Sequence, residues 1–294
     1  MKIPKKLSIS NKYLTVTIKT EGAEICSITD QNGTEYMWDA NPDVWSSHAP
    51  VLFPIIGSLK DKHFTYEGKK YYTPKHGFIR HNENLKVEDH SDSAISFRYT
   101  YSEDTLAIYP FKFDFTVTFS LEEKTLKVYH AVKNLGDETM LFSLGGHPAF
   151  KCPLTDAENY DDYLLSFETE ETCDTHLLDK EGLQSGKTAP LLQNDKILRL
   201  QHDLFKDDAL ILKDLVSRKV SLCHETKGEV ITVIFDDFNY LGVWAKPSGD
   251  FVCIEPWLGV TDASDTDGDF TKKEGNLQLE PQKEYEASYY IQIH

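Results

Sequence analysis

Three short segments of the sequence combine histidine, glutamate, glycine and proline in a way that could support acid–base chemistry. KHGFIR contains His76 and Arg80, and SLGGHPAF contains His147. CIEPWLG contains Glu255 and Trp257. A carboxylate at the end of an apolar stretch is a candidate for a raised pKa, because burial disfavours its charged form. Imidazoles and carboxylates commonly move protons near neutral pH, so the three segments together indicate an acid–base site, although a lone histidine is more often structural.

The segments that must position these residues show a period of two, which is typical of β-strands. In FKFDFTVTF, residues 111–119, four phenylalanines and Val117 fall on one face. The same alternation occurs in residues 13–18, 95–101, 125–132 and 285–293. Residues 230–235 are nearly all apolar, as expected for a strand that is covered on both faces. Turn signals such as Asn32-Gly33 and Lys227-Gly228 separate the runs, and no long stretch has a helical period, so the pattern predicts an all-β protein.

The strand pattern continues from residue 13 to residue 293 without a linker, a low-complexity tract or a clear repeat. We therefore predict one large antiparallel β-sandwich that forms a single domain over residues 1–294. Residues 155–195 are the most polar part, and we expect long loops or short helices there. So large a sheet has edges to cover, and a homodimer is one way to cover them.

The composition argues against several classes of partner. The 294 residues include 31 Lys and Arg against 48 Asp and Glu, which gives a formal net charge of −17. Such an acidic surface repels phosphate backbones, so we expect neither a nucleic acid nor an anionic membrane as partner. No apolar run approaches the roughly 20 residues of a membrane span, and no apolar core follows the N-terminal lysines as in a signal peptide. The five cysteines are scattered without a C-x-x-C pair, which favours free thiols in the cytoplasm.

Together, the motifs resemble the aldose 1-epimerase family, and most closely its branch of bacterial LacX-type proteins. The resemblance is carried by HAPVLFPIIGSLKD, KHGFIR, GGHPAF and IEPWLG followed by an acidic loop, and it covers the chain from about residue 48 onward. It implies a galactose mutarotase-like β-sandwich and an isomerase that needs no cofactor. Such an enzyme interconverts the α and β anomers of a free hexose in carbohydrate metabolism.

The resemblance also implies roles for individual residues. Mutarotation removes a proton from the anomeric hydroxyl and delivers one to the ring oxygen, so it needs one base and one acid. Glu255 resembles the family's base and His147 its acid, while His76 resembles the second histidine, which hydrogen-bonds the ring oxygen or a neighbouring hydroxyl. The acidic residue that holds sugar hydroxyls is best matched by Asp208, with its neighbour Asp207 as the alternative.

Two further residues are expected to bind the sugar. The indole of Trp257 could cover an apolar face of the ring. Many family members have an arginine soon after the LFP triplet, where this chain has Ser58. We expect Arg80 or Lys60 to supply that positive donor instead.

Three alternatives remain open. A hexose-6-phosphate 1-epimerase would need clustered cations, and few lie near the motifs of this acidic chain, so a free hexose is preferred. A sugar-binding or regulatory protein on the same fold would not need both an acid and a base. Residues 265–274 partly imitate a calcium loop, but Ala263 occupies the first ligand position and the flanks resemble strand and loop instead of helices, so no metal site is expected.

Overall fold

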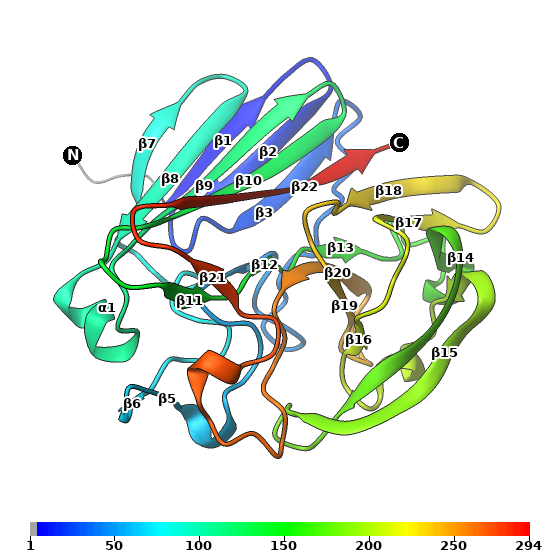
Figure 1. The fold of residues 1–294 in the computed structure, drawn as a ribbon. Coiled ribbons are helices and arrows are strands. Elements are labelled where there is room, and N and C mark those ends of the chain that lie inside the picture. The colour runs from blue at the N-terminus through cyan, green and yellow to red at the C-terminus, as the bar shows by residue number, and fades with distance from the viewer. Residues whose placement is uncertain (1–4) are drawn as a thin grey trace.

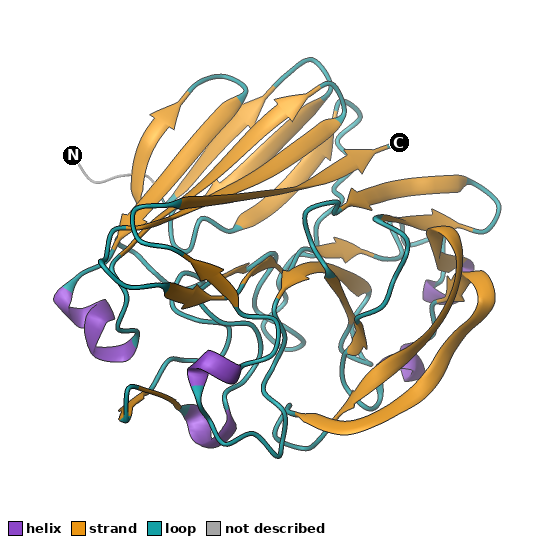
Figure 2. Ribbon diagram, in the orientation of Figure 1, coloured by secondary structure: helices purple, strands orange, loops and turns teal. Residues whose placement is uncertain are grey.

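Antiparallel strands make up most of the chain in the computed structural model, which describes residues 5–294 (Figures 1 and 2). Helical structure in this range is confined to α1 and four short 3₁₀ turns: α1 (Glu103–Ile108), η1 (Lys60–Lys62), η2 (Tyr160–Asp162), η3 (His202–Phe205) and η4 (Phe270–Lys272). None of these elements is long and apolar enough to cross a membrane. The prediction of an all-β, antiparallel fold is therefore confirmed.

The strands form one large sheet and three small ones. The large sheet follows the order β4-β12-β20-β19-β16-β14-β17-β18-β22-β10-β9-β8-β7, with β13 paired to β20 and β15 paired to β14. Its strands are β4 (Val51–Leu52), β7 (Lys86–His90), β8 (Ala94–Thr100), β9 (Phe113–Glu122), β10 (Thr125–Asn134), β12 (Leu144–Gly146), β13 (Ala149–Lys151), β14 (Tyr163–Leu178), β15 (Gln184–Arg199), β16 (Leu210–Leu212), β17 (Lys219–His224), β18 (Gly228–Ile234), β19 (Tyr240–Trp244), β20 (Phe251–Leu258) and β22 (Glu284–Ile293). The small sheets are β1 (Lys6–Ser10), β2 (Leu14–Lys19) and β3 (Ile25–Asp30); β5 (Phe64–Tyr66) and β6 (Lys69–Tyr71); and β11 (Met140–Phe142) and β21 (Leu277–Leu279).

The alternating residues form the core between these sheets. Phe113, Phe115, Val117 and Phe119 are all buried on one face of β9, as their spacing predicts. In Figure 1, β1–β3 lie behind β8–β10, and β1 contacts β9. One continuous hydrophobic cluster extends from Ile9 to Ile293, which supports the predicted single domain. All five cysteines are buried and unpaired.

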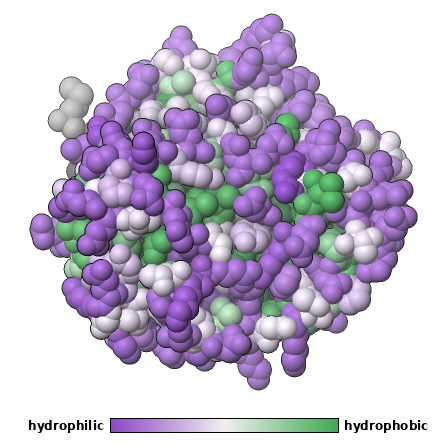
Figure 3. Space-filling view, in the orientation of Figure 1, coloured by the Kyte–Doolittle hydropathy of each residue, from purple (hydrophilic) through white to green (hydrophobic). Residues whose placement is uncertain are grey.

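The expectation for residues 155–195 is wrong. This segment holds most of the longest hairpin of the structure, β14 and β15, and only one short 3₁₀ turn, η2. The segment is polar because much of β15 and alternate positions of β14 face solvent, while Tyr163, Leu165 and Phe167 point into the core. In Figure 1 the hairpin curves along one side of the lower half of the molecule. Figure 3 shows that this face of the molecule is largely hydrophilic, with only small hydrophobic patches recessed near its centre.

Candidate active site

The sheet order brings the three sequence motifs onto neighbouring strands. β12, which contains the glycines of GGHPAF, lies between β4 and β20, with Gly145 opposite Leu52 on one side and Trp257 on the other. β13 follows His147 and also pairs with β20. His147 therefore lies at the break between two short strands that both pair with the strand carrying Glu255. Residues far apart in the sequence are held here by backbone hydrogen bonds.

Glu255 and His147 form the centre of the site. His147 Nε2 lies 3.2 Å from Glu255 Oε2, and the glutamate side chain is 1% exposed. Burial raises the pKa of Glu255 well above its ordinary value, and Lys75 and Arg80 oppose this rise only in part. Burial, helped by the positive charge of Arg80, lowers the pKa of His147 to about 3. Both shifts disfavour the state in which the carboxylate and the imidazolium are both charged.

His76 reaches the same place from the loop between β6 and β7. Its backbone has a φ of 63°, a left-handed conformation that non-glycine residues rarely adopt and that recurs at functional sites. The backbone N–H of Gly57 donates to His76 Nδ1 over 3.2 Å, so the proton of the neutral ring is on Nε2. The rings of His76 and His147 are 5.6 Å apart, edge to face. Burial and the neighbouring His147 lower the pKa of His76 well below its ordinary value, which favours the neutral ring.

The HGF and LFP triplets are positioned by each other. Gly77 has a φ of 78°, and a Cβ atom there would lie 1.9 Å from the carbonyl oxygen of Phe53. Phe78 N–H donates to that same oxygen over 3.0 Å. Only glycine fits between His76 and Phe78, so the close packing against Phe53 requires the glycine of the HGF triplet.

Two tryptophans that the sequence analysis did not identify enclose His147. The ring of Trp45 stacks on the imidazole at 5.0 Å, and the ring of Trp244 meets it edge to face at 5.8 Å. Trp45 lies in an irregular segment and Trp244 ends β19, so neither shows a recognisable motif. These rings exclude water from the imidazole and contribute to the low pKa of His147, which burial causes.

Trp257 forms an apolar wall, as expected. It clusters with Leu52, Ile56, Ile211 and Val260. A Cβ atom on Gly242 would lie 2.3 Å from its ring, and one on Gly145 would lie 2.9 Å from it. Two glycines on the flanking strands therefore make room for the indole. Its buried Nε1 makes no hydrogen bond of standard geometry in the described residues, but it points toward Glu255 closely enough to lower the pKa of that carboxyl.

A cavity of about 1010 Å³ surrounds the pair and includes all six predicted site residues, Glu255, His147, His76, Asp208, Arg80 and Trp257. Asp207 lines it too, but Asp208 is the carboxylate among the main causes that raise the pKa of Glu255. Asp208 is thus the better candidate of the two. Lys60 does not line the cavity, and its ammonium group donates to the carbonyl oxygen of Thr266. Of the two predicted positive donors, the structure therefore places Arg80 in the site.

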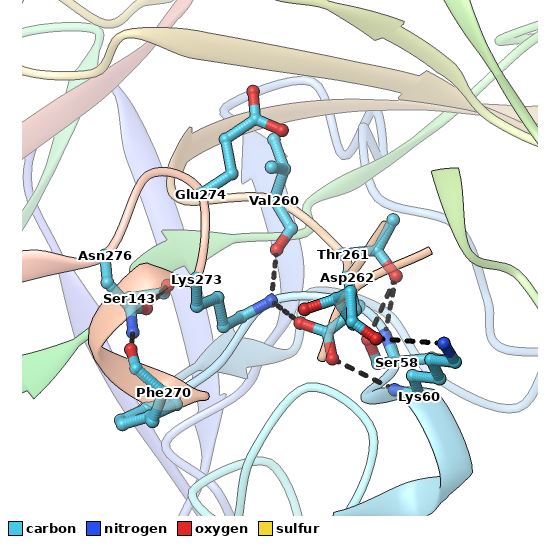
Figure 4. Close-up of polar contacts among 12 residues, drawn as sticks. Ser58, Lys60, Ser143, Val260, Thr261, Asp262, Phe270, Lys273, Glu274 and Asn276 are labelled. Atoms are coloured by element: carbon cyan, nitrogen blue, oxygen red, sulfur yellow. Dashed lines mark hydrogen bonds and ion pairs between the residues drawn. The ribbon is translucent and has the colours of Figure 1, made fainter. Parts of the chain in front are cut away.

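The acidic loop after β20 has a structural role at the cavity wall (Figure 4). Asp262 contacts Lys273 Nζ at 2.6 Å through one carboxylate oxygen and accepts the backbone N–H of Lys60 through the other. Lys273 Nζ also donates to the carbonyl oxygen of Val260. The Thr261 hydroxyl accepts from Ser58 N–H and donates to the carbonyl oxygen of Gly182, at the turn of the β14–β15 hairpin.

Further along this loop, the residues that resemble a calcium loop contact a lysine. Asp267 and Asp269 both pair with Lys272. Within the site, the nearest approach to a metal-ligand set is His147, Glu255 and Cys253, whose ligand atoms lie within 4.8 Å of one another. Burial raises the pKa of the Cys253 thiol well above its ordinary value, which disfavours the thiolate that a metal would need. The absence of a metal stays a prediction.

Comparisons with known proteins agree with this geometry. The family model "Aldose 1-epimerase" matches residues 5–278, and the chain therefore belongs to the aldose 1-epimerase family. The chromosomal protein LacX of Lactococcus lactis subsp. lactis is 36% identical over 269 residues, covering 87% of this chain and 88% of that protein.

Two solved structures share the fold over almost their whole length. A galactose mutarotase related enzyme from Lactobacillus acidophilus has a TM-score of 0.93 at 38% identity, covering 98% of this chain and 97% of that one. A galactose mutarotase-like protein from Lactobacillus casei has a TM-score of 0.92 at 29% identity, covering 98% and 100%. The predicted resemblance and the galactose mutarotase-like fold are thus confirmed, and the family supports an epimerase-type enzyme that acts on a sugar.

Proposed function

We propose that this protein is an aldose 1-epimerase that interconverts the α and β anomers of a hexose. The proposal rests chiefly on one observation, the buried contact of 3.2 Å between His147 Nε2 and Glu255 Oε2 in a cavity large enough for a sugar. A pair that holds one proton contains one acid and one base, whichever partner carries the proton. Ring opening of an aldose needs those two groups and no redox step.

In the proposed reaction, Glu255 removes the proton from the hydroxyl on C1 while His147 delivers a proton to the ring oxygen. The C1–O5 bond breaks, the C1 hydroxyl oxygen becomes the aldehyde oxygen, and rotation about C1–C2 exposes the other face. Reclosure returns both protons with the roles reversed, so the enzyme regains its starting state. The reaction starts with Glu255 ionised and His147 protonated, which is the reverse of the distribution that burial favours in the empty site, so the bound sugar must stabilise this charged form.

The surrounding residues orient the ring. His76 donates through Nε2 because Gly57 holds its Nδ1. Asp208 and Arg80 line the cavity and would bind the substrate, and Trp257 provides an apolar surface beside Glu255. We further infer a single-domain cytoplasmic protein with a small-molecule substrate and neither nucleic acid nor membrane as partner; the homodimer stays a prediction.

The test is Glu255→Gln, which keeps the shape of the side chain and removes its proton-accepting role. We expect sugar binding to persist, while the enzymatic anomerisation rate measured by polarimetry falls about 10²- to 10⁴-fold. Glu286→Gln, at an exposed site that contacts Tyr129, serves as the matched control and should retain the full rate. An unchanged rate in Glu255→Gln would reject the catalytic role of Glu255. No acceleration of anomerisation by the wild-type protein would favour a sugar-binding protein instead.

A further inference from the structure

The charges that line the cavity have the opposite balance to the chain as a whole. The chain carries a net charge of −17. Four acidic side chains line the cavity, Asp179, Asp207, Asp208 and Glu255, against six basic ones, Lys75, Arg80, Lys180, Lys187, Lys206 and Lys246. A basic cavity in so acidic a protein focuses a positive potential at one place on its surface.

The six basic residues have no acidic partner within ion-pair distance in residues 5–294. Other lysines of the chain do have one, such as Lys213 with Glu274 and Lys227 with Glu158. Among the described residues, the Arg80 guanidinium makes one hydrogen bond, to the hydroxyl of Ser47 at 3.5 Å, and its buried Nε has no acceptor. A buried guanidinium donor without an acceptor is costly, so the arrangement is suited to an anion that arrives with the ligand.

Within residues 5–294, the cavity's acidic side chains form no ion pair with these cations, although their charges offset part of the positive potential. Asp179 accepts two backbone N–H groups, from Glu181 and Leu183, and Asp208 accepts the N–H of Ala209. Glu255 is buried beside His147 at the centre of the site. The positive charges are therefore left available to a ligand.

The basic residues come from four separate parts of the chain that converge on the cavity. Lys75 and Arg80 flank His76, while Lys180 and Lys187 belong to the β14–β15 hairpin region. Lys206 and Lys246 follow η3 and β19, and all five lysines are exposed, whereas Glu255 and His147 are buried. The lysine side chains thus face solvent, whereas the acid–base pair at which C1 must react is buried. Of the five, Lys75 also acts on the pKa of Glu255 and of His147.

We propose that the substrate is an aldose that carries an anionic substituent, a phosphate monoester or a carboxylate, at a carbon remote from C1. This inference rests on the proposed epimerase function. The acidic net charge of the chain argued against such a substrate. Net charge, however, averages over the whole surface, whereas a bound ligand experiences the local potential of the cavity. The anion is held by the lysines and Arg80, while C1 and the ring oxygen face Glu255 and His147.

The test compares three groups of aldoses by NMR anomer-exchange kinetics: glucose and galactose, their 6-phosphates, and glucuronate and galacturonate. We expect kcat/KM to be roughly tenfold or more higher for an anionic group than for the neutral sugars, and this preference to shrink between low and high salt. Preference for the phosphates or for the uronates identifies the anion. Equal or better turnover of the neutral sugars would overturn the proposal.

Charge variants distinguish the effect of the cavity lysines from the effect of the net charge of the chain. The triple variant Lys187→Gln/Lys206→Gln/Lys246→Gln should lower the anionic-to-neutral ratio of kcat/KM by about tenfold. Its control removes three exposed lysines outside the cavity, Lys70, Lys86 and Lys124, and should leave the ratio unchanged. Equal effects of both variants would refute a local site. If no sugar is epimerised, the proposed function fails, and calorimetric binding of the same sugars still decides whether the cavity prefers anions.

Discussion

The buried ion pair between Lys273 and Asp262 offers a sharp test of how the cavity wall is held. The two side chains are 3% and 6% exposed, and their charged atoms lie 2.6 Å apart. Lys273→Met keeps most of the apolar stem but leaves Asp262 Oδ1 and the carbonyl oxygen of Val260 without their donor. Breaking a buried pair in this way typically costs about 3–5 kcal/mol. We expect a loss of about 3 kcal/mol, the lower end of this range, because the other carboxylate oxygen of Asp262 still accepts the N–H of Lys60.

Urea unfolding monitored by circular dichroism measures the free energy of unfolding. The control is the adjacent Lys272→Met, whose ammonium pairs with Asp267 and Asp269 but is 64% exposed, and which should leave stability unchanged. Adding Asp262→Asn to Lys273→Met removes the unpaired charge and should restore part of the loss. Similar stability of Lys273→Met and Lys272→Met would refute the reasoning. So would further destabilisation by Asp262→Asn in the Lys273→Met background.

Three further predictions concern catalysis. Because burial lowers the pKa of His147 to about 3, this imidazole does not titrate near the ordinary histidine value of 6.5, so kcat/KM should show no acid limb there. A proportional loss of polarimetric activity below pH 6.5 would contradict this. Gly242→Ala places a Cβ atom 2.3 Å from the Trp257 ring and should cost about 1–3 kcal/mol in urea unfolding together with activity; wild-type stability would contradict the packing argument. Asp208→Asn should raise KM about tenfold with little change in kcat, and a fall in kcat alone would show a different role.

The fold was predictable because its main signal is local. Alternation in residues 111–119 specifies which face of β9 is buried, and β9 matches that pattern. The hairpin of β14 and β15 was missed because its apolar residues are diluted by polar ones on a solvent-facing surface. Single-sequence polarity does not distinguish a half-exposed strand from a loop.

The site was predictable where chemistry requires unusual residues at close spacing. The glycines beside His76 and His147 are needed because backbone or aromatic side chains leave no room for a Cβ atom. These glycines therefore make the two motifs recognisable in the sequence. Trp45 and Trp244 carry no such mark, since their contact with His147 depends on tertiary packing alone. The cluster of cavity lysines was missed for the same reason, because they come from distant parts of the sequence.

The position of Thr261 has a consequence for the thermodynamics of binding. Its hydroxyl contacts Ser58 and Gly182, and its carbonyl oxygen accepts from the Gln184 side chain over 2.7 Å. One residue thereby ties the loop after β4, the turn of the long hairpin and the segment after β20 before any ligand arrives. Little conformational entropy is then lost when the cavity fills, because its walls are already ordered. Thr261→Val removes only the hydrogen bonds of the hydroxyl group. It should therefore weaken sugar binding mainly through a less favourable binding entropy, although Thr261 is not required for the chemistry.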